Sequence, residues 1–241
     1  MRLAVISDVH GNLRALEAVL ADIDERAPDA IVNLGDCVTS PLWPRETLEL
    51  LESRSLPTVR GNHDRWLADP ASTSSGGSVV FARDALTVAQ RATLGALPPT
   101  VALDDGVLAV HGTPASDVSY LLEDKVDGRL SFVTAETLGA RLDGVRANLV
   151  LCGHSHTQHV AADSAGRLVV NPGSVGCPRY ADNIDRLSNE AGSPHARYAV
   201  ATRRGARWSI ELVVLDYDWF EVARQAERNG RPDWARGFLG A

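Results

Sequence analysis

About the first sixty residues alternate between short apolar runs and longer amphipathic segments, and this alternation constrains the fold more than any other feature. The apolar runs at 2–7, 30–34 and 58–59 have the composition of buried strands. The segments 12–26 and 45–54 carry apolar residues at helical spacing. Such alternation favours parallel strands joined by right-handed crossovers. Because the carboxyl ends of such strands meet at one edge of a sheet, the sequence predicts an α/β fold with a ligand site at that edge.

The rest of the chain is predicted to continue as a mixture of strands and helices. We expect a buried strand at 148–152, hairpins at 101–110, 158–171 and 197–216, and helices at 79–97, 131–142, 219–228 and 232–239. Polar loops are expected at 70–78, 113–129 and 182–196. Because no repeat or long linker divides the chain, residues 1–241 are predicted to form a single domain, with 217–241 as a C-terminal helical extension.

Composition excludes several classes of protein. Hydrophobic residues make up 44% of the chain and charged residues 23%, as in ordinary soluble domains. No apolar run approaches the roughly 20 residues that span a bilayer, and the N-terminus becomes acidic at Asp8 without a signal-peptide cleavage region. We therefore expect a cytoplasmic protein with no membrane partner. The three cysteines are widely spaced, which argues against a disulfide framework or a zinc knuckle.

The charge balance limits the partners. The formal net charge is −7, and Lys125 is the only lysine among 24 basic residues. Because proteins that bind long stretches of nucleic-acid backbone usually carry a basic surplus, no extended nucleic acid is expected. The expected partner is a small phosphorylated substrate or a nucleotide, whose phosphate is met locally by metal ions and a few arginines.

Polar residues gather in five segments at the ends of predicted strands. The segments are Asp8-x-His10, Gly35-Asp36, Gly61-Asn62-His63-Asp64, His111-Gly112 and Gly153-His154-x-His156. They hold five of the seven histidines of the chain. Turn chemistry explains any one segment alone, but five at one rim indicate a metal site. Carboxylate, imidazole and amide ligands suit Mn, Fe, Zn, Ni or Co. Seven potential ligands exceed the need of one ion, so two divalent ions with a bridging carboxylate are expected.

The five segments together resemble the calcineurin-like metallophosphoesterase superfamily, whose pattern is DxH, GD, GNH[DE], H and GHxH. The opening AVISDVHGNLRALEAVL and the later NPGSVG are most similar to small bacterial phosphodiesterase-type members. The resemblance covers about residues 1–216. It implies an α/β fold built as a four-layer α/β/β/α sandwich of two mixed β-sheets flanked by helices. It also implies hydrolysis of a phosphodiester or phosphomonoester by attack of a metal-bridging hydroxide.

The resemblance implies separate roles for the residues of the five segments. Those expected to bind metal are Asp8, His10 and His156 for the first ion, Asn62, His111 and His154 for the second, and Asp36 as the bridge. His63 is expected to be catalytic, protonating the leaving oxygen or stabilising the charged transition state. Asp64 is expected to orient that imidazole.

Two residues outside the ligand set are weaker candidates for binding the substrate. Arg179 follows the NPGSVG loop and is a candidate phosphate clamp, although a solvated arginine is an equal alternative. Asn12 is expected mainly to cap the first helix, with phosphate contact as the minority option. The aromatic cluster near the C-terminus is expected to close the core, with an oligomer interface as the alternative.

Three functions remain open at the level of sequence. The favoured one is a metal-dependent phosphoric ester hydrolase. The alternatives are a non-catalytic scaffold of the same fold and a nuclease. Scaffold members lack the catalytic histidine, whereas this chain has His63. Preference for monoesters or diesters is expected to depend on the loops 66–78, 113–129 and 177–196.

Overall fold

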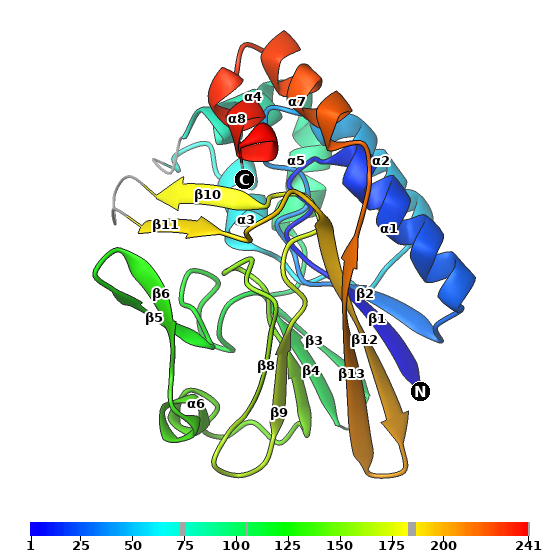
Figure 1. The fold of residues 1–241 in the computed structure, drawn as a ribbon, viewed down its shortest axis with the longest axis vertical. Coiled ribbons are helices and arrows are strands. Elements are labelled where there is room, and N and C mark those ends of the chain that lie inside the picture. Colours follow the sequence, from blue (N-terminus) through cyan, green and yellow to red (C-terminus); the bar gives the residue numbers. More distant parts are fainter. Residues whose placement is uncertain (73–75, 105, 183–186, 241) are drawn as a thin grey trace.

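Two β-sheets form the centre of the protein, and helices cover their outer faces (Figure 1). The computed structural model describes residues 1–72, 76–104, 106–182 and 187–240. Asp105 of the predicted hairpin 101–110 and part of the predicted loops 70–78 and 182–196 lie outside the described residues.

The first sheet contains the N-terminal strand. Its members, in spatial order, are β13 (Arg207–Leu215), β12 (Ala196–Arg204), β1 (Arg2–Ile6) and β2 (Ala30–Asn33). β1 is parallel to β2 and antiparallel to β12, so the sheet is mixed. The predicted strand at 58–59 reduces to one bridge between Thr58 and Asn33, although the chain there does continue the sheet beside β2.

The second sheet is also mixed. Its members, in spatial order, are β3 (Thr100–Asp104), β4 (Val107–Val110), β7 (Leu149–Leu151), β9 (Leu168–Asn171) and β8 (His159–Ala162). β4, β7 and β9 are parallel to one another, while β3 and β8 pair as antiparallel edges. The hairpins expected at 101–110 and 158–171 are therefore confirmed.

The side chains of β1 show how the layers are built. Leu3 and Val5 point into an apolar core between the two sheets, which Leu149 and Leu151 of β7 share. Ala4 and Ile6 point to the other face, where α1 (Leu13–Arg26) and α2 (Pro44–Arg54) pack. α6 (Ala135–Arg141) covers the outer face of the second sheet through Leu138. This order of helix, sheet, sheet and helix confirms the predicted four-layer sandwich.

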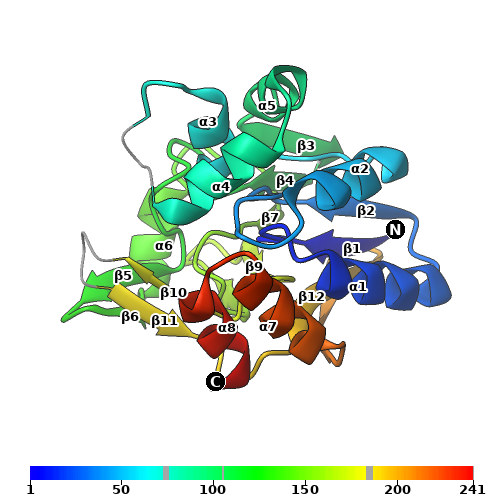
Figure 2. The same ribbon diagram turned by 90° about the horizontal axis from the view of Figure 1, so that it is seen from above.

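The C-terminal helices form at the predicted residues. α7 (Trp219–Arg228) and α8 (Pro232–Leu239) pack on each other and on Leu42 through buried side chains such as Phe238. Trp208 belongs to the predicted aromatic cluster near the C-terminus, but it packs against the core between the two sheets. Seen from above, α7 and α8 lie on the opposite side of the sheet ends from α3 (Asn62–Ala68) and its neighbours (Figure 2).

Two predicted helices are shorter than expected. The segment 79–97 forms α4 (Gly77–Ala85) and α5 (Val88–Gly95), because Thr87 begins a new helix with a capping box to Gln90. α6 begins only at Ala135, after the cap Thr134, because the residues before it belong to a strand.

Two hairpins replace parts of the predicted loops. β5 (Glu123–Val126) pairs with β6 (Arg129–Phe132) inside the segment expected to be irregular. β10 (Arg179–Asp182) pairs with β11 (Leu187–Glu190). The backbone N–H of Ser188 donates to the carbonyl oxygen of Gly128 at 3.3 Å, so the two hairpins contact each other.

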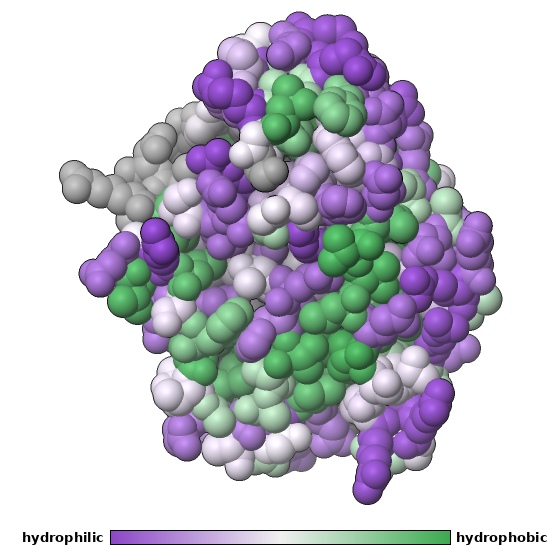
Figure 3. All heavy atoms as spheres, in the orientation of Figure 1, coloured by the Kyte–Doolittle hydropathy of each residue, from purple (hydrophilic) through white to green (hydrophobic). Residues whose placement is uncertain are grey.

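The surface carries an apolar region on the face shown in Figure 3. Leu212 and Val214 of the edge strand β13 are among the large hydrophobic side chains that are exposed. Within the described residues, no helix combines the length and apolar character needed to cross a bilayer.

Candidate metal centre

The predicted ligands come together at the carboxyl ends of parallel strands. Asp8 and His10 follow β1, and Asp36 follows β2. His111 follows β4, and His154 and His156 follow β7. The structure gathers six of these side chains into two groups, Asp8 with His10 and His156, and Asp36 with His111 and His154. Within each group the possible ligand atoms lie within 4.8 Å of one another.

The first group is compact and nearly inaccessible to solvent. The Nε2 atoms of His10 and His156 lie 3.1 Å apart, and Nε2 of His156 lies 3.3 Å from Oδ1 of Asp8. All three residues are buried. Three ligand atoms of this kind around one point suit a divalent transition-metal ion.

The second group includes the amide predicted to complete it. Nε2 of His111 lies 2.9 Å from Oδ1 of Asn62 and 3.4 Å from Oδ2 of Asp36. Oδ2 of Asp36 also lies 3.7 Å from Nε2 of His10, in the first group. One carboxylate therefore reaches both groups, as expected for a bridging ligand.

Backbone carbonyl groups orient three of the imidazoles. Nδ1 of His10 donates to the carbonyl oxygen of Thr39 at 3.0 Å, and Nδ1 of His111 donates to that of Leu34 at 2.8 Å. Nδ1 of His156 donates to the carbonyl oxygen of Cys177 at 2.9 Å. Because a carbonyl oxygen only accepts, each ring carries its proton on Nδ1 in these contacts. Neutral rings held in this way present Nε2 as a ligand.

Asp8 supplies the test of whether a metal fits. Its Oδ2 accepts hydrogen bonds from Oγ of Ser7 at 2.6 Å and from the backbone N–H of His154 at 3.1 Å. Its Oδ1 is buried and has no hydrogen-bond partner. An unpartnered buried carboxylate oxygen is costly, and this one faces Nε2 of His156. A cation bound between them would satisfy that oxygen, so these residues fit a metal ion.

The backbone is strained where it carries the ligands. Eight non-glycine residues among those described have positive φ angles. Five of them are predicted ligands, namely Asp8 (54°), His10 (45°), Asp36 (55°), His154 (67°) and His156 (59°). Left-handed conformations of non-glycine residues carry a strain energy that persists at functional sites. The strand-end loops are therefore shaped to aim these side chains.

Two motif glycines allow the loops to approach each other. A Cβ at Gly61 would lie 2.1 Å from Oδ1 of Asp36, and one at Gly153 would lie 2.1 Å from Oγ of Ser7 and 2.9 Å from Oδ2 of Asp8. Such distances are far below van der Waals contact. The glycines of the GNHD and GHSH segments are therefore required by the close packing of the ligand loops.

Each carboxylate of the site is paired with one imidazole. Burial raises the pKa of Asp8, but His156 outweighs it and lowers the pKa to about 2. Burial likewise opposes ionisation of Asp36, yet the imidazoles of His111, His63 and His10 hold the pKa of Asp36 well below its ordinary value. In return, although burial opposes the charged form, Asp36 raises the pKa of His111 to about 9, and Asp8 raises that of His156 well above its usual range.

The two other ligand imidazoles stay neutral. Burial and then the neighbouring His156 lower the pKa of His10 to about 4. Burial and then His111 lower the pKa of His154 to about 3. In each group, these pKa shifts favour the charged form of one imidazole and the neutral form of the other.

His63 lies beside the ligands without joining either group. Its ring is edge-on to His10 at 5.2 Å and to Trp66 at 4.7 Å between centroids. Its Nδ1 is buried and unpartnered, and burial, the largest influence, lowers the pKa of His63. Trp66 is a neighbour of this imidazole that the sequence did not suggest.

The carboxylate of Asp64 contacts backbone groups rather than the ring of His63, and its predicted role in orienting that imidazole stays a prediction. Its carboxylate accepts hydrogen bonds from the backbone N–H groups of Asp36 at 2.9 Å, Cys37 at 3.0 Å and Gly61 at 2.9 Å. Adjacent residues of a helix point in different directions, so Asp64 of α3 turns away from the imidazole of His63. Burial and then Asp36 raise the pKa of Asp64 to about 7. Asp64 ties the Asp36 loop to the start of α3.

The two substrate-binding candidates lie in structural contacts. Asn12 caps α1, and its Nδ2 donates to the carbonyl oxygen of Gly176 and to the hydroxyl of Tyr217. Both N–H groups are used inside the protein, which supports the capping role, while a phosphate contact of Asn12 stays a prediction. Arg179 pairs across its hairpin with Glu190 at 2.9 Å, and a role in substrate binding stays a prediction.

The unpredicted hairpins bring further side chains to the site. Tyr120 stacks on His154 at 4.6 Å, and Tyr180 packs on His156 at 4.7 Å between centroids. The two tyrosine hydroxyls lie 3.1 Å apart. Because these tyrosines belong to a loop and a short strand of polar composition, no sequence pattern indicated their position.

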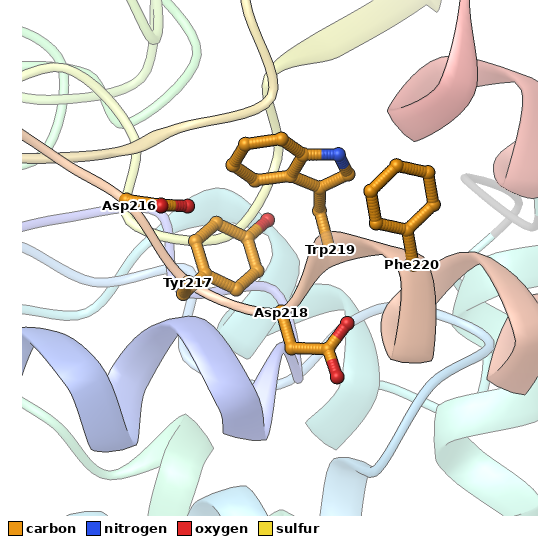
Figure 4. A pocket seen from close by; sticks show the side chains of 5 residues that line it. All are labelled: Asp216, Tyr217, Asp218, Trp219 and Phe220. Atoms are coloured by element: carbon orange, nitrogen blue, oxygen red, sulfur yellow. The ribbon is translucent and has the colours of Figure 1, made fainter.

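Two pockets lie outside the ligand groups. One, of about 350 Å³, is lined by Arg60, Arg65, Asp117 and neighbours of His111 in the chain. The other, of about 390 Å³, is lined by residues 216–220 at the start of α7 (Figure 4). Asp218 in this second pocket caps α7, and none of the predicted ligands lines it.

Relatives of similar sequence or similar fold occur among known proteins. A family model described as "Calcineurin-like phosphoesterase superfamily domain" matches residues 1–188. The uncharacterized protein MJ0912 of Methanocaldococcus jannaschii is 28% identical over 264 residues, which cover 99% of this chain and 98% of that protein. A metallophosphoesterase from Sphaerobacter thermophilus is 27% identical, with a TM-score of 0.75 over 100% of this chain and 99% of the other. A hypothetical protein, PH1004, from Pyrococcus horikoshii OT3 has the same fold at 20% identity, with a TM-score of 0.74 over 97% and 95% of the two chains.

Proposed function

Because the chain belongs to the calcineurin-like phosphoesterase superfamily, we propose that it hydrolyses a phosphate ester with the help of two divalent metal ions. The observation that carries this proposal is the carboxylate of Asp36, which reaches the imidazoles of both ligand groups. The first ion would be held by Asp8, His10 and His156. The second would be held by His111, His154 and Asn62, with Asp36 shared.

The chemistry requires a nucleophile, charge neutralisation and a proton for the leaving group. Two bound cations would acidify a water molecule and neutralise the charge of the phosphoryl group. His63 would donate the proton to the leaving oxygen. Burial lowers the pKa of its imidazole, which makes the protonated form a stronger acid, and a phosphate beside it would favour that form.

The chain holds the proton donor by packing. The ring of His63 lies between His10 and Trp66, while Asp36 accepts a hydrogen bond from the backbone N–H of His63 at 2.9 Å. The same carboxylate thus fixes the position of the donor relative to both ions. Trp66 packs against the imidazole and would help to orient it.

The substrate is a small phosphorylated molecule or a nucleotide of the cytoplasm. The residues that line the pocket of about 350 Å³ include Arg60 and Thr113, each two residues along the chain from a member of the second group, Asn62 or His111. This pocket would offer room for the alcohol part of an ester. Arg65 forms a bidentate pair with Asp117 at 2.7 Å in its wall. The choice between a phosphomonoester and a phosphodiester rests on this pocket and the two hairpins.

The proposal is tested by hydrolysis of p-nitrophenyl phosphate and bis-p-nitrophenyl phosphate. Metal-free protein is assayed alone and with Mn, Fe, Zn, Ni or Co ions, beside His63→Ala as the control. We expect turnover only with added metal, and a steep loss in His63→Ala. Absence of turnover with every ion would favour the scaffold function. The presence of His63 beside the two ligand groups is the feature that favours the enzyme over the scaffold.

A further inference from the structure

The segment His154-Ser155-His156 contributes one imidazole to each ligand group. A shift of this short segment would therefore disturb both groups together. The residue between the two histidines, Ser155, is completely buried. Its contacts decide where both imidazoles lie.

Ser155 is held by side chains from three strands. Its Oγ donates to Oε1 of Glu123 on β5 at 2.8 Å and accepts from Nδ2 of Asn171 on β9 at 3.0 Å. Its carbonyl oxygen accepts from Nδ2 of Asn189 on β11 at 2.6 Å. Nδ2 of Asn189 also donates to Oγ1 of Thr157, at 3.1 Å. The segment is thus tied to the second sheet and to both hairpins.

Glu123 is an unusual residue in this network, because its side chain is a buried carboxyl group. Only 2% of its surface is exposed, and burying such a group is costly unless it is hydrogen-bonded. Its backbone carbonyl oxygen accepts from Nη1 of Arg141 at 2.9 Å, which fixes the start of β5. Glu123 belongs to neither ligand group, and the proposed reaction makes no use of it.

The same two hairpins also contact the imidazole rings directly. Tyr120, just before β5, stacks on His154, and Tyr180 of β10 packs on His156. The hydroxyl groups of the two tyrosines are within hydrogen-bond distance, at 3.1 Å. The two hairpins and the residues just before them therefore contact the backbone, the serine hydroxyl and both imidazole rings of the ligand segment.

We propose that Glu123 and Asn189 are positioning residues of the metal centre. By holding Ser155 from two separate hairpins, they present His154 and His156 to two different ions at once. This inference rests on the proposed function, since it requires that both groups bind metal. Residues that orient metal ligands typically affect affinity by roughly 10–100-fold.

Substitutions of Glu123 separate its shape from its charge. In Glu123→Gln, the carbonyl oxygen can still accept from Ser155, so the position of the segment is retained. In Glu123→Ala, the acceptor is lost and Oγ of Ser155 has one partner fewer. Asn189→Ala removes the contact from the other hairpin at a half-buried site. Glu136→Ala removes an exposed carboxylate of α6 and serves as the matched control.

The experiment is calorimetric titration of each metal-free variant with Mn²⁺, together with the melting temperature of the metal-free protein. We expect Glu123→Ala and Asn189→Ala to weaken binding of both ions by about 10–100-fold. Glu123→Gln and Glu136→Ala should bind both ions as the unsubstituted protein does. If Glu123→Ala fails to fold, Asn189→Ala carries the same test.

Several results would overturn the inference. Unchanged affinity in both Glu123→Ala and Asn189→Ala would show that the network does not position the ligands. Equal loss in Glu123→Ala and Glu123→Gln would assign the effect to charge. A lowered melting temperature with unchanged metal affinity would show that the network stabilises the fold and does not position the ligands. Failure of the unsubstituted protein to bind metal would instead refute the proposed function, so the two failures are distinguishable.

Discussion

Gly61→Ala tests how closely the ligand loops approach each other. The backbone at Gly61 has φ −80° and ψ 169°, a conformation that alanine adopts freely. The effect of the substitution is therefore purely steric. The added Cβ would lie 2.1 Å from Oδ1 of Asp36 and 2.5 Å from its backbone nitrogen.

The expected cost follows from these two distances. To restore van der Waals contact, the carboxylate of Asp36 must move by about 1 Å, and such overpacking costs about 1–3 kcal/mol. The movement also breaks the hydrogen bond from the backbone N–H of His63 to Oδ1 of Asp36, at 2.9 Å, which contributes about 1.5–3 kcal/mol because the acceptor is charged. We expect a total loss of about 2.5–6 kcal/mol, or roughly 5–24 °C in melting temperature.

The assay combines thermal unfolding of the metal-free protein with Mn²⁺ titration. Gly61→Ala should lower the melting temperature and weaken both ions, because Asp36 reaches both groups. Gly237→Ala is the control, since a Cβ there would meet nothing within 4 Å and alanine favours the interior of α8. If Gly61→Ala melted and bound metal like the unsubstituted protein, the inferred contact between these two loops would be refuted.

Three further predictions concern the individual side chains of the site. His63→Ala should keep both ions in a Mn²⁺ titration while lowering turnover by about 10²–10⁴-fold, and release of metal would show that His63 is a ligand. Asn62→Ala should weaken only the second ion, so equal weakening of both would contradict its place in that group. Burial lowers the pKa of His111, but Asp36 outweighs it and raises the pKa to about 9. Because a metal ligand must be deprotonated, metal binding at neutral pH should release protons. Affinity should therefore rise as the pH approaches 9, and calorimetric enthalpies that do not depend on the buffer would refute this.

The sequence predicted the ligand set because the ligands follow apolar runs that form strands without help from distant residues. β1, β2, β4 and β7 all end where the apolar runs end, so the residues after them meet at one edge. The helices α1 and α7 also follow directly from apolar spacing and their side-chain caps, and α8 follows from apolar spacing and the proline at its start.

The two hairpins could not be predicted from the sequence because one strand of each, β5 or β11, lacks an apolar face. β5 reads EDKV with three exposed residues, and β11 reads LSNE with a single buried residue, Leu187. Their stability depends on tertiary contacts, such as those of Glu123 and Asn189 with Ser155. Their contribution to the metal centre was hidden for the same reason.

Asp64 shows a different limit. Its position next to His63 suggested that the two side chains act together, but neighbours in a helix do not face each other. Two of the three partners of its carboxylate, Asp36 and Cys37, are 28 and 27 residues away in the chain.

The break between α4 and α5 at Thr87 could have been predicted from the sequence, since Thr87 and Gln90 form a capping box.

The central claim is that two ions share the carboxylate of Asp36 and that hydrolysis depends on both. It is tested most directly by titrating metal-free protein with Mn²⁺ while following hydrolysis of bis-p-nitrophenyl phosphate and p-nitrophenyl phosphate. We predict that two ions bind per chain and that turnover of at least one ester appears as the second site fills. Binding of one ion or none, or turnover that persists after metal removal, would contradict the claim.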